Sequence, residues 1–140
     1  MLLAYLGFPF YDVATLPLLH NEGFTEFNPI KVDRISPDDA KSIRPGGTRV
    51  TLRGTEFYNF GAFFSRAYRE NDYLWGRLHG AERMVDLVVS TMTDPMEKDE
   101  IARFKRELFL AILDEEESRL RADPALVRGL RSEVQSRLPE

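Results

Sequence analysis

The chain has 140 residues, a formal net charge of -4, 43% hydrophobic and 30% charged residues, and no cysteine. A chain of this size has room for one sizeable hydrophobic core, so two independent domains are excluded. The lack of cysteine excludes a disulfide scaffold, a thiolate zinc site and a cysteine nucleophile. We therefore expect residues 1–140 to form a single domain, or a fragment of one, in a reducing cytoplasm.

Charges of both signs are spread along the chain, and the sequence pI is about 5.3. Because no block of lysine and arginine is available to collect phosphates, we expect no nucleic-acid partner. No segment reaches the roughly 18 consecutive apolar residues that a membrane span requires, so we expect no span. The apolar run at residues 2–6 begins abruptly, which suggests that the native core starts before Met1. Such an exposed apolar N-terminus also favours self-association.

The first half of the chain predicts a small β element. Residues 30–35 and 48–53 alternate apolar with polar side chains and are rich in β-branched residues, which is typical of short strands. The pair Gly46-Gly47 before the second strand favours a hairpin turn. Between the two strands, Ser36-Pro37 followed by two aspartates is the pattern of a helix N-terminus and predicts one short helix.

The second half predicts helices. Apolar residues recur at helical spacing over 72–92, with Asn71 as the expected N-cap, and again over 96–121 and 126–138. Asp94-Pro95 and Asp123-Pro124 fit the starts of the last two helices. The acidic run at 114–117 is expected to be a solvated face. The predicted fold class is thus mainly α with a short two-stranded β element (α+β), and a C-terminal half like a helical bundle.

Several chemistries have no motif in this chain. No Gly-x-Ser-x-Gly elbow, dinucleotide-binding glycine motif or phosphate-binding loop is present. The two histidines, His20 and His79, belong to no metal-ligand pattern. We therefore expect no cofactor, no metal and no catalytic residue.

Aromatic residues are concentrated in one segment, because eight of the sixteen lie within residues 57–75. One interpretation is that these rings form the main core, and the other is that they form a surface that docks on another domain or on lipid. Either way, the candidate block comprises Phe57, Phe60, Phe63, Phe64, Tyr68 and Trp75, followed by Gly76 and Gly80.

Gly76 and Gly80 lie four residues apart within a predicted helix, where each glycine costs roughly 1 kcal/mol relative to alanine. We expect their bare face to let another backbone approach closely. The charges interleaved with the aromatic residues alternate in sign, and we expect them to pair with one another. The candidate buried ion pairs involve Arg69, Asp72, Arg77 and Glu82.

Several segments of the sequence occur in the order found in one known family. They are residues 6–12, 34–39, 61–66, 69–78 and 81–83. On these segments, about residues 5–92 resemble the uncharacterised domain that lies C-terminal to the catalytic domain in large bacterial patatin-related proteins, whereas 93–140 form a less characteristic helical tail. The resemblance implies a setting beside a lipid acyl hydrolase with a Ser–Asp dyad. The Gly-x-Ser-x-Gly and Asp-Gly motifs of that dyad are absent here, so no catalytic residue is carried over.

The leading hypothesis is a non-catalytic module with a structural or docking role beside a patatin-like hydrolase domain or another protein surface. A second hypothesis is a lipid- or substrate-guiding module that uses an exposed aromatic surface. A third is an independent enzyme, which requires convergence of acidic groups and an imidazole in one cleft. The residues that would have to converge are Glu70, Asp72, His79 and Glu82.

Overall fold

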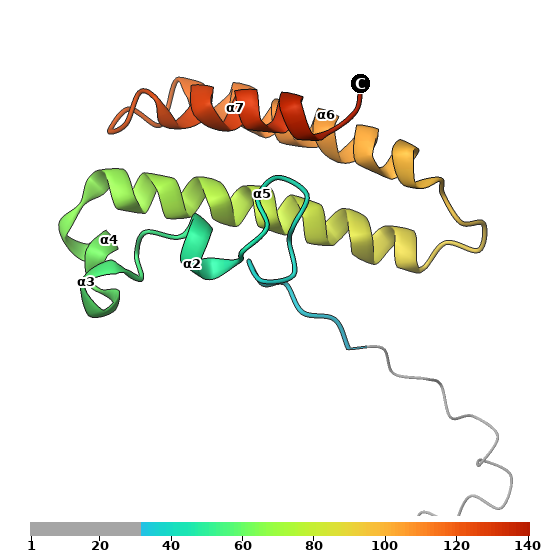
Figure 1. Cartoon of the computed structure of the whole chain (residues 1–140), viewed down its shortest axis with the longest axis horizontal. Coiled ribbons are helices and arrows are strands. Elements are labelled where there is room, and N and C mark those ends of the chain that lie inside the picture. Colours follow the sequence, from blue (N-terminus) through green and yellow to red (C-terminus); the bar gives the residue numbers. More distant parts are fainter. Residues whose placement is uncertain (1–31) are drawn as a thin grey trace, which may run out of the picture. The chain divides into compact units, whose positions relative to one another are not determined.

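The computed structural model describes residues 32–140, in which three long helices follow three single turns (Figure 1). The long helices are α5 (Arg66–Ser90), α6 (Lys98–Glu117) and α7 (Leu126–Arg137), and the short turns are α2 (Thr48–Thr51), α3 (Glu56–Asn59) and α4 (Gly61–Phe64). The apolar run at residues 2–6, for which we expect self-association, lies outside the described residues.

The hydrophobic core lies between the three long helices. The helix α6 packs against both α5 and α7, and Figure 1 shows α5 running along one side of the pair formed by α6 and α7. Each long helix contributes one buried stripe, because its apolar residues recur every three or four positions. The core comprises Ile43, Leu74, Trp75, Leu78, Phe109, Ile112, Leu113, Leu120, Val127, Leu130 and Val134.

An irregular segment, residues 36–47, is fastened to α5 by a buried carboxylate. The Oε1 atom of Glu82 accepts hydrogen bonds from the backbone amides of Lys41 (2.8 Å) and Ser42 (3.1 Å) and from the Ser42 hydroxyl (2.8 Å). The Lys105 ammonium from α6 lies 3.8 Å from the same oxygen and 2.6 Å from Asp86 Oδ1. Because these contacts satisfy the buried carboxylate, Glu82 links the irregular segment to two helices.

The predicted β element is wrong, since no strand occurs in residues 32–140. Residues 32–35 are irregular, and residues 48–51 form the turn α2. Gly46 and Gly47 have φ values of 121° and 63°, but they lead into α2 and not into a hairpin. The Thr51 hydroxyl donates to the Gly47 carbonyl oxygen (2.9 Å), which closes the turn. The alternation does not follow burial here, because the polar Thr51 is buried and the apolar Val50 is 49% exposed.

The helix predicted after Ser36-Pro37 is also wrong. The Asp39 amide donates to the Ser36 carbonyl oxygen (3.0 Å), which forms a turn that does not continue as a helix. The expected N-cap Asn71 lies inside α5, where its side chain donates to the Thr51 carbonyl oxygen (2.9 Å). The residue that caps α5 is Ser65, whose hydroxyl accepts from the Tyr68 amide.

The helices α6 and α7 lie where the helical spacing predicts them, but their first residues differ. Their N-cap residues are Glu97 and Ala125, and neither side chain makes a capping hydrogen bond. Asp123 still contributes at the start of α7, because its Oδ1 atom accepts from the Ala125 amide (3.0 Å). The aspartate-proline pairs therefore mark the approach to each helix and not its cap.

Trp75 is 1% exposed and lies under the Arg44 guanidinium, whose carbon is 5.0 Å from the ring. Replacing Trp75 with alanine opens a large cavity and is expected to lower the free energy of unfolding by about 3–5 kcal/mol. The matched control is Phe64→Ala, which removes a ring that is 76% exposed and is expected to stay within about 0.5 kcal/mol of the parent. Urea denaturation measures both, and equal stabilities for the two variants would contradict this description of the core.

Candidate functional site

The most unusual surface of the described chain lies on α3, α4 and the residue between them. Phe57, Phe60, Phe63 and Phe64 are 71%, 60%, 75% and 76% exposed, and we call these four residues the phenylalanine tip. The interpretation of the aromatic block as core is therefore wrong for these four residues. Trp75 of the same block is buried. A folded chain does not normally expose four neighbouring phenylalanines, so the tip is a candidate contact surface.

The backbone of the tip adopts an unusual conformation. Phe57, Tyr58 and Asn59 have φ values of 52°, 57° and 72°, so α3 is a left-handed turn despite its helical hydrogen bonds. This region costs an ordinary residue roughly 1–2 kcal/mol because Cβ crowds the following carbonyl oxygen. Asparagine tolerates it better than phenylalanine or tyrosine do. Surrounding contacts must therefore hold this turn in place.

Those contacts come from the first two turns of α5. The Asp72 carboxylate accepts from the backbone amides of Arg53 and Gly54, each at 2.7 Å. The Tyr68 hydroxyl donates to Glu56 Oε2 (2.8 Å), and a Cβ atom on Gly61 would lie 2.7 Å from the Arg53 carbonyl oxygen. Position 61 therefore requires glycine, and the phenylalanine tip is presented by a braced backbone.

Three arginines border the phenylalanine tip. Arg69 donates to the carbonyl oxygens of Ala62 (2.8 Å) and Phe63 (3.1 Å), and the Arg53 guanidinium carbon lies 5.6 Å from the Tyr68 ring centre. The Arg66 side chain is 70% exposed and contacts Glu70 through Nε (2.8 Å). All three side chains therefore keep part of their guanidinium groups accessible beside the exposed rings.

Of the acidic residues next to these arginines, Glu70 pairs with Arg66 as the charge pattern predicts, whereas Asp72 binds backbone amides. Glu70 is buried, and the amide of Ala122 donates to it (2.8 Å), which together with Arg66 holds the pKa of Glu70 below its ordinary value. Asp72 binds backbone amides, and Arg69 binds carbonyl oxygens. The predicted ion pairs of Arg69 and Asp72 are thus wrong within residues 32–140.

The other two predicted ion-pair residues do meet opposite charges. Arg77 contacts Glu116, whose side chain is fully buried, and also contacts Glu115 (2.8 Å), so the pKa of Arg77 is raised. Glu82 has Lys105 nearby. Sequence reasoning missed Glu116 because it lies in an acidic run. The available signal was its spacing, since it continues the stripe formed by Phe109, Leu113 and Leu120.

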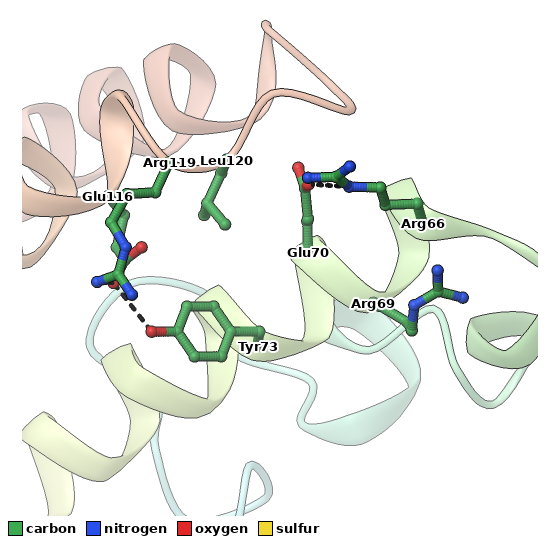
Figure 2. Close-up of a pocket in the computed structure, with 7 residues that line it drawn as sticks. All are labelled: Arg66, Arg69, Glu70, Tyr73, Glu116, Arg119 and Leu120. Carbon is green, nitrogen blue, oxygen red and sulfur yellow. Dashed lines mark hydrogen bonds and ion pairs between the residues drawn. The ribbon is translucent and has the colours of Figure 1, made fainter.

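A surface groove of about 500 Å³ lies between the first two turns of α5 and the C-terminal end of α6 (Figure 2). Figure 2 shows Leu120 and Tyr73 between two charged walls, with Arg66 and Glu70 on one side and Glu116 and Arg119 on the other; Arg69 points away. The Tyr73 hydroxyl donates to Glu116 Oε1 (3.0 Å). Each wall carries its own ion pair, Arg66–Glu70 on one side and Arg119–Glu116 on the other. A charged ligand would therefore have to compete with these pairs.

The residues of the enzyme hypothesis lie in different surroundings. Glu70 lines the groove of Figure 2, whereas Asp72, His79 and Glu82 do not. His79 is 4% exposed, stacks on Trp75 with ring centres 5.0 Å apart, and has no hydrogen bond to either ring nitrogen from residues 32–140. Within the described part of the chain, no group of three or more histidine, aspartate or glutamate side chains is arranged to hold a metal ion.

The glycine stripe of α5 does not make the expected close contact. Gly76 is exposed and Gly80 half-buried, and a Cβ atom added to either would meet nothing within 4 Å among the described residues. The prediction of a close backbone approach at these glycines is therefore wrong for residues 32–140.

Comparison with known proteins identifies the family. The model of the family described as "Protein of unknown function (DUF3376)" matches residues 2–134. The chain belongs to this family. It is also 45% identical over 62 residues to the "Uncharacterized membrane protein Rv3479" of Mycobacterium tuberculosis (strain ATCC 25618 / H37Rv), a match that covers 43% of this chain and 6% of that protein. No solved structure matches the chain.

The DUF3376 chain thus spans a small fraction of the length of this curated relative. Among residues 32–140, the structure has no helix with the length and apolar composition needed to cross a bilayer.

The pair Arg77–Glu116 can be tested by a double-mutant cycle in the DUF3376 chain. Either Arg77→Met or Glu116→Gln alone leaves buried polar groups without their partner, and each is expected to lower the free energy of unfolding by about 3 kcal/mol. Together they are expected to cost clearly less than the sum, because both charges of the pair are removed. Strict additivity in urea denaturation would show that the two charges do not interact.

The burial of His79 predicts a pH dependence of stability. Burial holds the pKa of His79 below 6.5, and this effect outweighs the opposite influence of Glu82 and Asp38. The unfolded chain then binds more protons, so the free energy of unfolding is largest above pH 6.5. It is expected to fall on acidification by at most about 1.4 kcal/mol per pH unit.

Comparison of the parent with His79→Leu between about pH 8 and 5.5 isolates this contribution, because His20 is present in both proteins. We expect the variant to lose less stability than the parent over this interval. Parallel stability curves for the two proteins would contradict the assignment.

Proposed function

We propose that this chain is a non-catalytic docking module that works beside a patatin-like lipid acyl hydrolase domain. The setting is supported by the resemblance of residues 61–66, 69–78 and 81–83 to the domain that follows the hydrolase in patatin-related proteins. The lack of catalysis is supported by the absence of the Gly-x-Ser-x-Gly and Asp-Gly motifs from the sequence. We keep the cytoplasm as the proposed compartment.

The observation that carries the docking role is the exposure of the phenylalanine tip. The helices α5, α6 and α7 bury their own core without these four rings. Burial of a phenylalanine side chain stabilises a protein by roughly 1.5–3 kcal/mol, so the fold gains little of this hydrophobic free energy from the four exposed rings. A second surface that covers the rings gains this free energy on binding, and the braced backbone reduces the entropy lost on binding.

The experiment that tests the docking role measures retention on an immobilised phenyl matrix. Phe63→Ser/Phe64→Ser is expected to elute markedly earlier than the parent, because the tip supplies the accessible apolar surface. The matched control is Phe104→Ser on α6, which removes a phenylalanine that is 54% exposed outside the tip, and a smaller change is expected. Equal retention of the two variants would overturn the docking role.

Catalysis is tested on the same preparations. The purified chain is expected to show no turnover of short-chain acyl esters above the rate in buffer alone. Turnover that a single substitution at Glu70, Asp72, His79 or Glu82 abolishes would show that the chain is an enzyme and would overturn the non-catalytic assignment.

A further inference from the structure

We propose that the phenylalanine tip docks the module on the surface of an anionic lipid bilayer. In this arrangement the four phenylalanine rings enter the region between the headgroups and the acyl chains, while Arg53, Arg66 and Arg69 contact lipid phosphates. This inference rests on the proposed function, in which the tip is the docking surface, and it names the partner of that surface.

The shape of the phenylalanine tip fits a bilayer. Figure 1 shows α3 and α4 at the N-terminal end of α5, away from its long packed face. The four rings are carried on two single turns, and Phe63 and Phe64 lie edge to face with centres 5.1 Å apart. A protein partner needs a matching pocket for each projecting ring, whereas the interfacial layer of a bilayer accommodates rings without one.

The charge around the tip favours an anionic surface. Residues 53–69 contain three arginines and one glutamate, a net charge of +2, in a chain whose net charge is -4. The glutamate, Glu56, accepts a hydrogen bond from the Tyr68 hydroxyl (2.8 Å). Basic side chains next to an apolar surface are attracted to anionic headgroups, and long arginine side chains reach the phosphates while their stems stay with the apolar groups.

The structure also removes the neighbouring acids from this surface. In the sequence, Glu70 and Asp72 follow Arg69 closely and suggest local neutrality. In the folded chain, Glu70 is buried and accepts from the Ala122 amide and from Arg66 Nε, and Asp72 accepts from two backbone amides. Glu70 thus neutralises Arg66 in part, whereas Arg53 and Arg69 form no ion pair among residues 32–140, and these two arginines make the apolar surface at the tip cationic.

The strained backbone of α3 is a second, independent observation. Phe57 and Tyr58 hold left-handed φ values that bulky side chains rarely adopt, and Tyr58 is 95% exposed. Strain of this kind persists where surrounding contacts impose it, and it occurs preferentially at sites of function. Here it coincides with the most exposed aromatic side chains of the described chain.

The experiment is co-sedimentation of the whole chain with vesicles of phosphatidylcholine alone and of phosphatidylcholine mixed with phosphatidylserine. We expect tighter binding to the mixed vesicles, and weaker binding when salt is raised, because the arginine contacts are screened. Phe63→Ser/Phe64→Ser is expected to reduce the partition coefficient at least about tenfold. Arg66→Gln is expected to reduce it about fivefold on mixed vesicles.

Two matched controls lie on α6, outside the tip. Phe104→Ser removes an exposed phenylalanine and Arg103→Gln removes an exposed arginine, and both are expected to bind the mixed vesicles as the parent does. Thermal unfolding shows that each variant is folded. If the double phenylalanine variant does not fold, Phe60→Ser is used in its place, and a loss of binding of about threefold or more is expected.

The outcomes separate the two proposals. Retention on phenyl matrix that depends on the tip, without binding to mixed vesicles, would overturn the bilayer proposal and leave the docking role intact. The bilayer proposal is likewise overturned, and the docking role kept, if the tip instead binds a purified patatin-like hydrolase domain and Phe63→Ser/Phe64→Ser abolishes that binding. Retention that does not depend on the tip overturns the docking role itself.

Discussion

The candidate site depends on the hydrogen bonds between the side chains of Asn71 and Asp72 and the backbone of residues 51–54. These two side chains project from the second turn of α5 and bind the Thr51 carbonyl oxygen and the amides of Arg53 and Gly54. Because each bond involves the backbone, the path of the chain before α3 is fixed irrespective of its side chains. The rings of the phenylalanine tip are thereby free to face outward without loss of order in the turns that carry them.

The same helix performs two further tasks on other sides. Leu74, Trp75 and Leu78 face the core, and Glu82 holds the amides of Lys41 and Ser42. Residues on α5 thus connect the core, the irregular segment and the tip through one rigid element. This explains why so many of its polar residues are buried, since a buried carboxylate is tolerated only where several donors meet it.

The sequence predicts the long helices well and the segment before them poorly. Spacing of apolar residues identifies α6 and α7, because a stripe that repeats every three to four positions has few alternatives over twelve or more residues. Over residues 48–53 the alternation spans too few positions to separate a strand from a single turn. The decisive contacts there come from Asp38 and Thr51, and the Thr48 amide donates to Asp38 Oδ1 (3.0 Å) across ten residues. No local pattern reports such contacts.

The sequence also predicts the candidate site only in part. Composition locates the aromatic cluster but does not tell its buried residues from its exposed ones. Of Phe57, Phe60, Phe63 and Trp75, only Trp75 is buried. The difference arises because Trp75 lies on the core stripe of α5, whereas the phenylalanines precede that helix on turns that contribute no side chain to the core cluster of residues 32–140. Likewise, Glu70 and Asp72 look in the sequence like partners of the nearby arginines, and Glu70 does pair with Arg66. That both carboxylates also accept from backbone amides is a property of the fold.

These two facts have one physical consequence. Asp72 binds backbone amides and Glu70 is buried against Arg66 and the Ala122 amide, so Arg53 and Arg69 keep their positive charge without an acidic partner among residues 32–140. When apolar rings lie on turns outside the core, they keep their exposed area. A segment that is neutral and apparently core-forming in sequence thus becomes a cationic, apolar surface in the folded chain. The folded backbone therefore determines the surface chemistry of the phenylalanine tip, and this chemistry is the basis on which we propose a docking role.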